Sequence, residues 1–88
     1  MTPADLTRLR QDATVVLGPL SPLDFPGEPV NWANLRCVES SWVVPDTGSP
    51  YASVLIEEAD PSATGLCMEV SKRLARRGWP DISVRTEW

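Results

Sequence analysis

The sequence contains no histidine, and this absence removes several kinds of chemistry at once. Ser-His and Cys-His nucleophile pairs, imidazole general bases and histidine metal ligands are all excluded. Only two cysteines are present, far apart in the chain, so they form no zinc-binding motif. There is also no glycine-rich phosphate loop, no dinucleotide-binding fingerprint and no calcium loop. The sequence therefore predicts no cofactor and no metal, and it argues against most classes of enzyme.

Long apolar runs are missing as well. No segment approaches the roughly 20 apolar residues that span a bilayer, and residues 1–12 lack the apolar core of a secretory signal. We therefore expect a cytoplasmic protein that does not enter the membrane.

Two cysteines are too few for a disulfide framework. We expect Cys37 and Cys67 to be buried free thiols. A disulfide between them is the alternative if both face the layer between helix and sheet.

Positive charge is scarce, with eight Lys and Arg against twelve Asp and Glu and a net charge of −4. Such a chain lacks the basic footprint that nucleic-acid binding normally needs. The basic residues are concentrated near the end of a predicted helix, where they complement the helix dipole. The basic residues at the end of this helix could also bind an acidic partner, and folding explains every other feature of the helix. They are Lys72, Arg73, Arg76 and Arg77.

The composition is that of one small folded domain spanning residues 1–88. A hydrophobic content of 42% is too high for a disordered chain. A chain of 88 residues also leaves little room for a second domain.

The first segment, residues 1–17, has the pattern of an amphipathic helix. Thr2 is a good N-cap, Pro3 suits the first helical position, and Gly18 followed by Pro19 stops the helix. An apolar stripe at helical spacing supports this prediction: Leu6, Leu9, Ala13, Val16 and Leu17.

Residues 18–30 contain four of the nine prolines of the chain and predict an irregular, largely extended connection. Two PxxP sequences lie here, but neither has the flanking basic residue that a proline-recognition domain uses. We expect Leu20, Leu23 and Phe25 to pin the connection across the core.

A β-hairpin follows. Residues 34–44 and 51–58 have the composition of strands, and residues 45–50 between them form a strong turn signal. The alternation of apolar residues changes phase within the first strand. We expect a bulge at Ser40 and Ser41 that resets it.

The stretch from Asp60 to Trp88 has the clearest pattern. Asp60 as N-cap and Pro61 at the first position predict the start of a long helix, and Gly78 predicts its end. We expect Trp79 to fold back on this helix as an apolar cap. The apolar stripe of the long helix is Ala63, Leu66, Cys67, Val70 and Leu74. The strand that follows the helix should turn Ile82, Val84 and Trp88 to the core.

The element order is thus α-β-β-α-β, with residues 31–88 forming the hairpin, helix and strand of the core. Because the last strand follows a helical crossover, it should run parallel to the second strand. The spatial order could be 2-1-3 or 1-2-3, and we expect 2-1-3 because a helix of this length easily spans one intervening strand. The predicted fold is an α+β two-layer sandwich, a three-stranded mixed sheet packed on helices.

In that order the edge strands are 51–58 and 82–87. The edge at Tyr51–Ile56 is the more apolar and could recruit another strand or a second copy of the chain, so a monomer or a homodimer is expected. The edge at 82–87 carries alternating charge, which discourages pairing.

Carboxylates are the remaining candidates for catalysis. A glycosidase-type pair needs a cleft and one acid with a raised pKa, and Glu57 and Glu58 point to opposite faces of a strand. We therefore expect solvated charges and no enzymatic site among these residues: Glu39, Glu57, Glu58 and Asp60.

Four of the six aromatic residues are tryptophan, which is enriched at binding hot spots. Core packing accounts for some of them, but a bulge that turned Trp42 outward beside Val44 would create an exposed apolar patch. The candidate partner-binding residues are Trp32, Trp42, Tyr51, Arg73, Arg76 and Arg77.

Three stretches resemble small proteins encoded by actinobacterial phages: LRCVE in the first strand, VLIEEADP before the long helix, and RRGWPDISVRTEW at the end. The resemblance includes no catalytic motif. It implies an accessory role in an infected host cell and no particular mechanism.

We therefore expect a non-enzymatic phage accessory protein that binds and modulates a host or phage macromolecule. The alternative is a virion or assembly component that acts as a symmetric oligomer. The first predicts a monomer or dimer and the second a stable ring or multimer, so the size in solution separates them.

Overall fold

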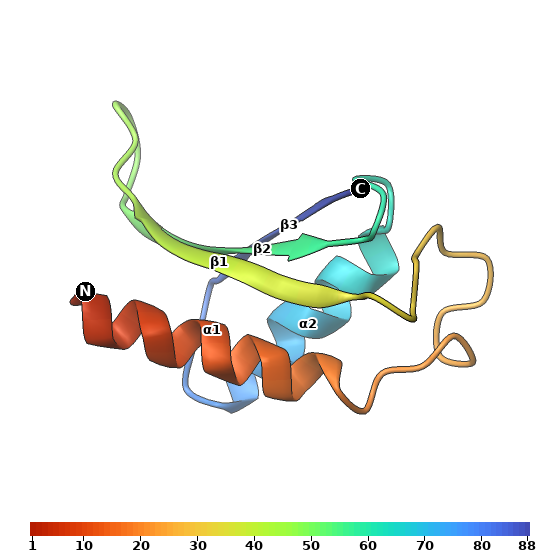
Figure 1. The fold of residues 1–88 in the computed structure, drawn as a ribbon. Coiled ribbons are helices and arrows are strands. Elements are labelled where there is room, and N and C mark those ends of the chain that lie inside the picture. The colour runs from red at the N-terminus through yellow and green to blue at the C-terminus, as the bar shows by residue number, and fades with distance from the viewer.

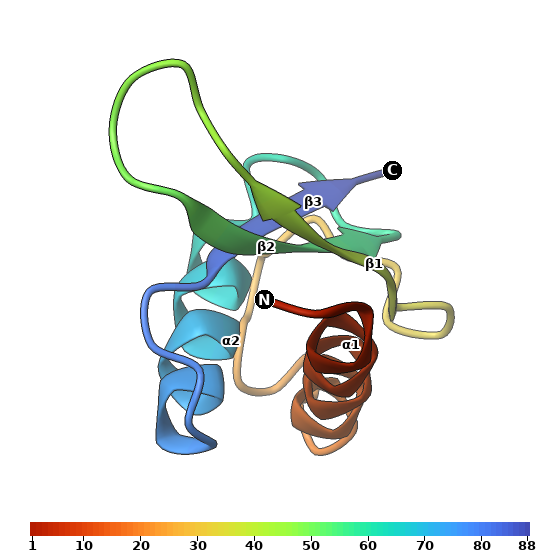
Figure 2. The ribbon, with the colours of Figure 1, turned by 90° about the vertical axis from the view of Figure 1, so that its left-hand side faces the viewer.

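Two helices pack against one face of a three-stranded mixed sheet, and the other face of the sheet carries no helix (Figure 1, Figure 2). The structure, a computed structural model, describes residues 1–88. Its elements follow the predicted order and confirm the α+β class. They are α1 (Pro3–Leu17), β1 (Arg36–Val43), β2 (Tyr51–Glu57), α2 (Thr64–Arg76) and β3 (Ser83–Glu87).

The strands lie in the order β1-β2-β3, so the expected order 2-1-3 is wrong. β1 and β2 form an antiparallel hairpin, and β3 runs parallel to β2, as predicted for a strand after a helical crossover. The central strand is therefore β2, and Tyr51–Ile56 is not an edge. The reason lies in β1, which is irregular between Cys37 and Glu39 and is tied to α1 by the Ser40 hydroxyl, which donates to Leu6 O. The free side of β2 offers β3 a regular partner.

The bulge in β1 lies at Val38, between Cys37 and Glu39, and so precedes the Ser-Ser pair where we expected it. Beyond the bulge the strand alternates regularly. Trp42 pairs with Ala52, whose side chain is buried, so Trp42 lies on the helix-facing side of the sheet and not on the open face.

Local sequence signals place α1 correctly. The Thr2 hydroxyl accepts the Asp5 N–H (3.2 Å) and the Asp5 carboxylate accepts the Thr2 N–H (3.0 Å), which completes a capping box around Pro3. The helix ends at Leu17, directly before Gly18, as predicted.

The proline-rich connection is anchored by two of its three predicted contacts. Leu20 is buried, and the ring of Phe25 stacks on Trp32 with centroids 5.8 Å apart. Leu23 is 91% exposed, so its expected core contact is wrong. It lies in a tight turn closed by the Asp24 N–H and Ser21 O (3.0 Å), and this turn points it into solvent.

The start of α2 differs from the prediction. Asp60 does not cap the helix, because its carboxylate bonds within the preceding turn and the helix begins only at Thr64. The actual N-cap, Ala63, has no side-chain acceptor. A carboxylate from the proline-rich connection supplies it instead, since Glu28 Oε1 accepts the Gly65 N–H at 2.9 Å.

The contact between Glu28 and α2 requires the glycine at position 65. A Cβ atom there would overlap the Glu28 carboxylate. We expect Gly65→Ala to lower the free energy of unfolding by up to about 1 kcal/mol, because loss of the cap outweighs the better helix propensity of alanine. In a Glu28→Ala background the same substitution should instead raise that free energy by up to about 1 kcal/mol, because only the propensity remains.

Urea denaturation of the four proteins of this cycle measures both effects. A Gly65→Ala change that has the same sign in both backgrounds would rule out Glu28 as the cap.

The chain turns back after α2 and buries Trp79, as predicted, but the polar contacts of its ring are with Asp12 and Arg8 of α1. Gly78 has a φ of 94°, and the two C-terminal bonds of a Schellman motif are present: Gly78 N–H to Ala75 O (3.1 Å) and Trp79 N–H to Leu74 O (3.0 Å). The chain thereby turns back, and Trp79 is 8% exposed against the helix layer.

The core lies between the sheet and the helices and includes several side chains with no exposed surface, among them Leu9, Val54, Ile56, Leu66 and Leu74. Ile82 is buried and Val84 half-buried, as expected. Trp88 is 60% exposed, so its predicted core position is wrong. Because α2 begins late, no helix covers it, and its indole N–H donates to Asp60 Oδ2 (2.6 Å).

Candidate functional site

Half of the exposed large hydrophobic side chains gather at the end of the sheet where the β1–β2 loop lies. Met1, Trp42, Val44 and Tyr51 are 48%, 42%, 69% and 39% exposed, and the N-terminus lies under the hairpin (Figure 1). We refer to these four residues and Pro50 as the aromatic surface. The other four exposed large hydrophobic residues lie elsewhere: Val15, Leu23, Met68 and Trp88.

Four residues of the aromatic surface border a hollow of about 320 Å³: Met1, Trp42, Pro50 and Tyr51. Three buried side chains contribute to its wall, from β2 and from the turn before β3: Ala52, Trp79 and Ile82. Asp81 has the one charged side chain beside it. The hollow is therefore an apolar depression with a single carboxylate at its border, and its shape suits an apolar side chain better than a charged group.

Trp79, at the base of the hollow, is held from behind by α1. Its indole N–H donates to Asp12 Oδ2 (2.6 Å), and the guanidinium of Arg77 donates to Asp12 Oδ1 (3.0 Å). The guanidinium of Arg8 lies 4.8 Å from the centroid of the same ring. The Trp79 N–H and the Arg77 guanidinium hold the pKa of Asp12 below its usual value of 3.8. The base of the hollow is thus fixed before any partner binds.

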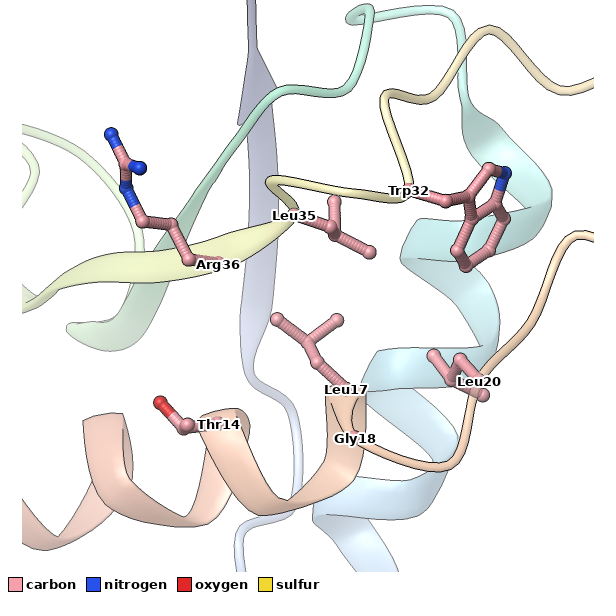
Figure 3. Close-up of a pocket in the computed structure, with 7 residues that line it drawn as sticks. All are labelled: Thr14, Leu17, Gly18, Leu20, Trp32, Leu35 and Arg36. Carbon is pink, nitrogen blue, oxygen red and sulfur yellow. The ribbon is translucent and has the colours of Figure 1, made fainter.

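Trp32 lies elsewhere, at the opposite end of β1. It lines a separate pocket of about 290 Å³ between the end of α1 and the segment that leads into β1 (Figure 3). Leu17, Leu20 and Leu35 point into this pocket, and Trp32 packs against Phe25. Its half-buried, stacked ring supports the connection, so the structure does not join Trp32 to Trp42 in one site.

The three candidate arginines are not equivalent. Arg73 donates to Glu69 Oε1 (2.9 Å), which lowers the pKa of that carboxyl, and Arg77 pairs with Asp12. Arg76 is exposed and has no ion pair. Two of the three guanidinium groups are therefore engaged within the chain, and none of the three arginines borders the hollow itself.

The acidic residues at the end of β2 are each engaged separately. Glu57 binds Arg36 (2.6 Å), and Glu58 accepts from the side-chain amide of Asn31 (3.3 Å). Hydrogen bonds from Ser62 and Trp88 lower the pKa of Asp60. No group of three or more acidic or cysteine side chains is arranged to hold a metal ion.

Both thiols are free. Cys37 is buried on β1 and Cys67 half-buried on α2, and burial raises the pKa of each. A raised pKa keeps a thiol protonated at neutral pH, so neither cysteine is an activated nucleophile.

Sequence reasoning named Trp42 and Tyr51 as candidates but missed the contact of Asp12 that fixes Trp79 beside them. Asp12 flanks the apolar stripe of α1, where charge is ordinarily solvated, and its partner Trp79 is 67 residues away. No local pattern marks such a contact.

Neither helix has the length and apolar character to cross a membrane. Comparison with protein-family models, with curated proteins and with solved structures finds no match for this chain.

Proposed function

We propose that this chain is a protein-binding accessory protein that acts by contact and not by catalysis, with the aromatic surface as its contact. One observation supports this most directly: three of the eight exposed large hydrophobic residues, Met1, Trp42 and Tyr51, gather around one hollow with a fixed base. The resemblance to actinobacterial phage proteins suggests the setting, the cytoplasm of an infected host.

The chemistry of the surface fits a protein partner. Tryptophan and tyrosine bury large areas while few rotamers are frozen, and contiguous exposed apolar patches on small domains commonly mark interaction sites. The partner would insert an apolar side chain into the hollow beside Trp42. A basic group next to that side chain would meet Asp81.

Trp42→Ser tests this proposal. The tagged chain is used to capture partners from a lysate of an actinobacterial host, and bound proteins are identified by mass spectrometry. A partner of the aromatic surface should lose at least about thirtyfold in affinity for Trp42→Ser, the effect of removing a hot-spot residue worth about 2 kcal/mol. Leu23→Ser is the matched control, because Leu23 is 91% exposed and outside the surface.

Two outcomes would contradict the proposal. One is a partner whose affinity falls equally for both variants while circular dichroism shows that both are folded. The other is an empty capture together with a ring-sized species on sizing, which would favour a virion or assembly component.

A further inference from the structure

The edge of the sheet at β3 presents unpaired backbone groups. β3 pairs only with β2, and the Glu87 carbonyl accepts the Ala59 N–H (3.1 Å) on that side. Because backbone groups alternate along a strand, Arg85 and Ser83 also turn theirs toward β2. Val84 and Thr86 therefore turn theirs to the open edge. Unlike β1, β3 has no bulge to obstruct pairing.

The charges on β3 are unbalanced within one chain. On the open face of the sheet, Glu57 lies in register between Arg36 and Glu87. Arg36 pairs with Glu57 (2.6 Å), so Glu87 has a like charge as its neighbour and no cation. Arg85 donates to the Ser53 hydroxyl (2.9 Å) but has no carboxylate partner. Like charges on neighbouring strands are unfavourable, and a cation from outside the chain beside Glu87 would relieve this repulsion.

Apolar surface lies beside the same edge. Met68 on α2 is 73% exposed and Trp88 is 60% exposed. Between α2 and β3 runs an open groove of about 440 Å³, whose apolar lining is Cys67, Met68, Ile82 and Val84. These side chains lie on the helix-facing side of β3, whereas the charges of Arg85 and Glu87 lie on the open face.

We propose that two copies of this chain pair antiparallel through β3, with Thr86 of one copy opposite Thr86 of the other. This register uses the backbone groups that point outward, at Val84 and Thr86. It places Arg85 opposite Glu87 of the second copy, twice by symmetry, and Val84 opposite Trp88 of the second copy. Each unpaired charge gains its counter-ion, and each exposed indole lies over the groove of the other copy.

Charge selects this register over its neighbours. A shift that centres the pair on Arg85 sets two arginines directly opposite each other, which is unfavourable. A shift that centres it on Val84 leaves Glu87 opposite Asp81. Alternating charge therefore discourages most partners of this edge but admits one, an antiparallel copy of itself.

The pairing is independent of the proposed function, and it adds a second property to the molecule. The two sheets would join into one continuous sheet with both aromatic surfaces available, so a single particle would present the proposed contact twice.

Charge reversal tests the pairing. Sedimentation equilibrium at concentrations up to about 1 mM should show a monomer–dimer equilibrium for the natural chain, because one strand pair makes a small interface. Glu87→Arg and Arg85→Glu should each raise the dissociation constant at least tenfold, to about the limit of detection, because both symmetric ion pairs become repulsive. Glu87→Arg should remain folded, since it gains Glu57 as a neighbour within the chain.

Mixing the two variants provides the stringent test. Each alone repels itself, but a Glu87→Arg chain opposite an Arg85→Glu chain restores both attractive pairs, so the mixture should form heterodimers. The double variant should dimerise again by itself. Trp88→Ser should weaken the natural dimer, whereas Trp42→Ser should not. A natural chain that stays monomeric throughout, or a dimer that neither charge reversal affects, would overturn the proposal.

Discussion

Ile56→Ala is expected to lower the free energy of unfolding by about 2–5 kcal/mol, the loss typical of a fully buried aliphatic side chain cut back to a methyl group. Ile56 has no exposed surface and lies on the central strand, between Cys37 on β1 and Thr86 on β3. The cavity left by the missing atoms would be bounded by the sheet and the helix layer. A chain of this length has a total stability of only about 4–13 kcal/mol, so the loss is a large share of it.

Urea denaturation followed by tryptophan fluorescence measures this loss, and the slope against urea should stay unchanged. Ile56→Val should cost only about 0.5–1.5 kcal/mol, because it removes one methyl group. Leu23→Ala, at a fully exposed position, should stay within about 0.5 kcal/mol of the natural chain. An alanine at position 56 that costs no more than the valine would place Ile56 outside the core.

Asp12→Ala is expected to cost about 1–3 kcal/mol, because it leaves the indole N–H of Trp79 and the guanidinium of Arg77 without their acceptor. Most of that cost belongs to the half-buried bond to Trp79. The ion pair contributes less, since Arg77 is 44% exposed and water screens it. Asp12→Asn keeps an acceptor for Trp79 and should cost less than alanine. Equal losses in the two variants would argue against the hydrogen bond.

The stability difference between the natural chain and Asp12→Asn should depend on pH with a known sign. The pKa of Asp12 is lowered in the folded state, so its carboxylate stabilises the fold above its unfolded pKa near 3.8, and this contribution disappears as the pH falls through the lower folded value. The stability difference between the natural chain and Asp12→Asn should therefore shrink as the pH falls below about 5. Asp5, Asp60 and Glu69 also have lowered pKa values, but they are common to both proteins and cancel.

What the sequence predicts correctly is local. The Thr2 cap of α1 and the stop of α2 before Gly78 involve residues a few positions apart, and both are found where expected. The element order and the parallel crossover follow from the same short-range patterns.

The errors concern contacts between distant residues. Asp60 and Pro61 form a good local start for α2, but Asp60 bonds to Ser62 and Trp88 instead, and the cap comes from Glu28. The strand order depended on which side of β2 was free, and this was decided by the irregularity of β1 and its contact with α1. For the site, aromatic residues could be identified by type, but their grouping could not. The hairpin register brings Trp42 opposite Ala52 and Tyr51 opposite Val43, so that both border one hollow, whereas Trp32 is held at the far end of the strand.

The distant cap on α2 has a consequence for how the chain folds. Glu28 and Gly65 are 37 residues apart, so the first turn of α2 gains its acceptor only after the hairpin has formed and the proline-rich connection has returned to the helix. Closing that loop costs chain entropy before the contact gives any stabilisation. The C-terminal turns of α2, closed locally by Gly78 and Trp79, carry no such delay. α2 is thus expected to grow from its C-terminal end, and its first turn to order in the same late step as residues 18–30.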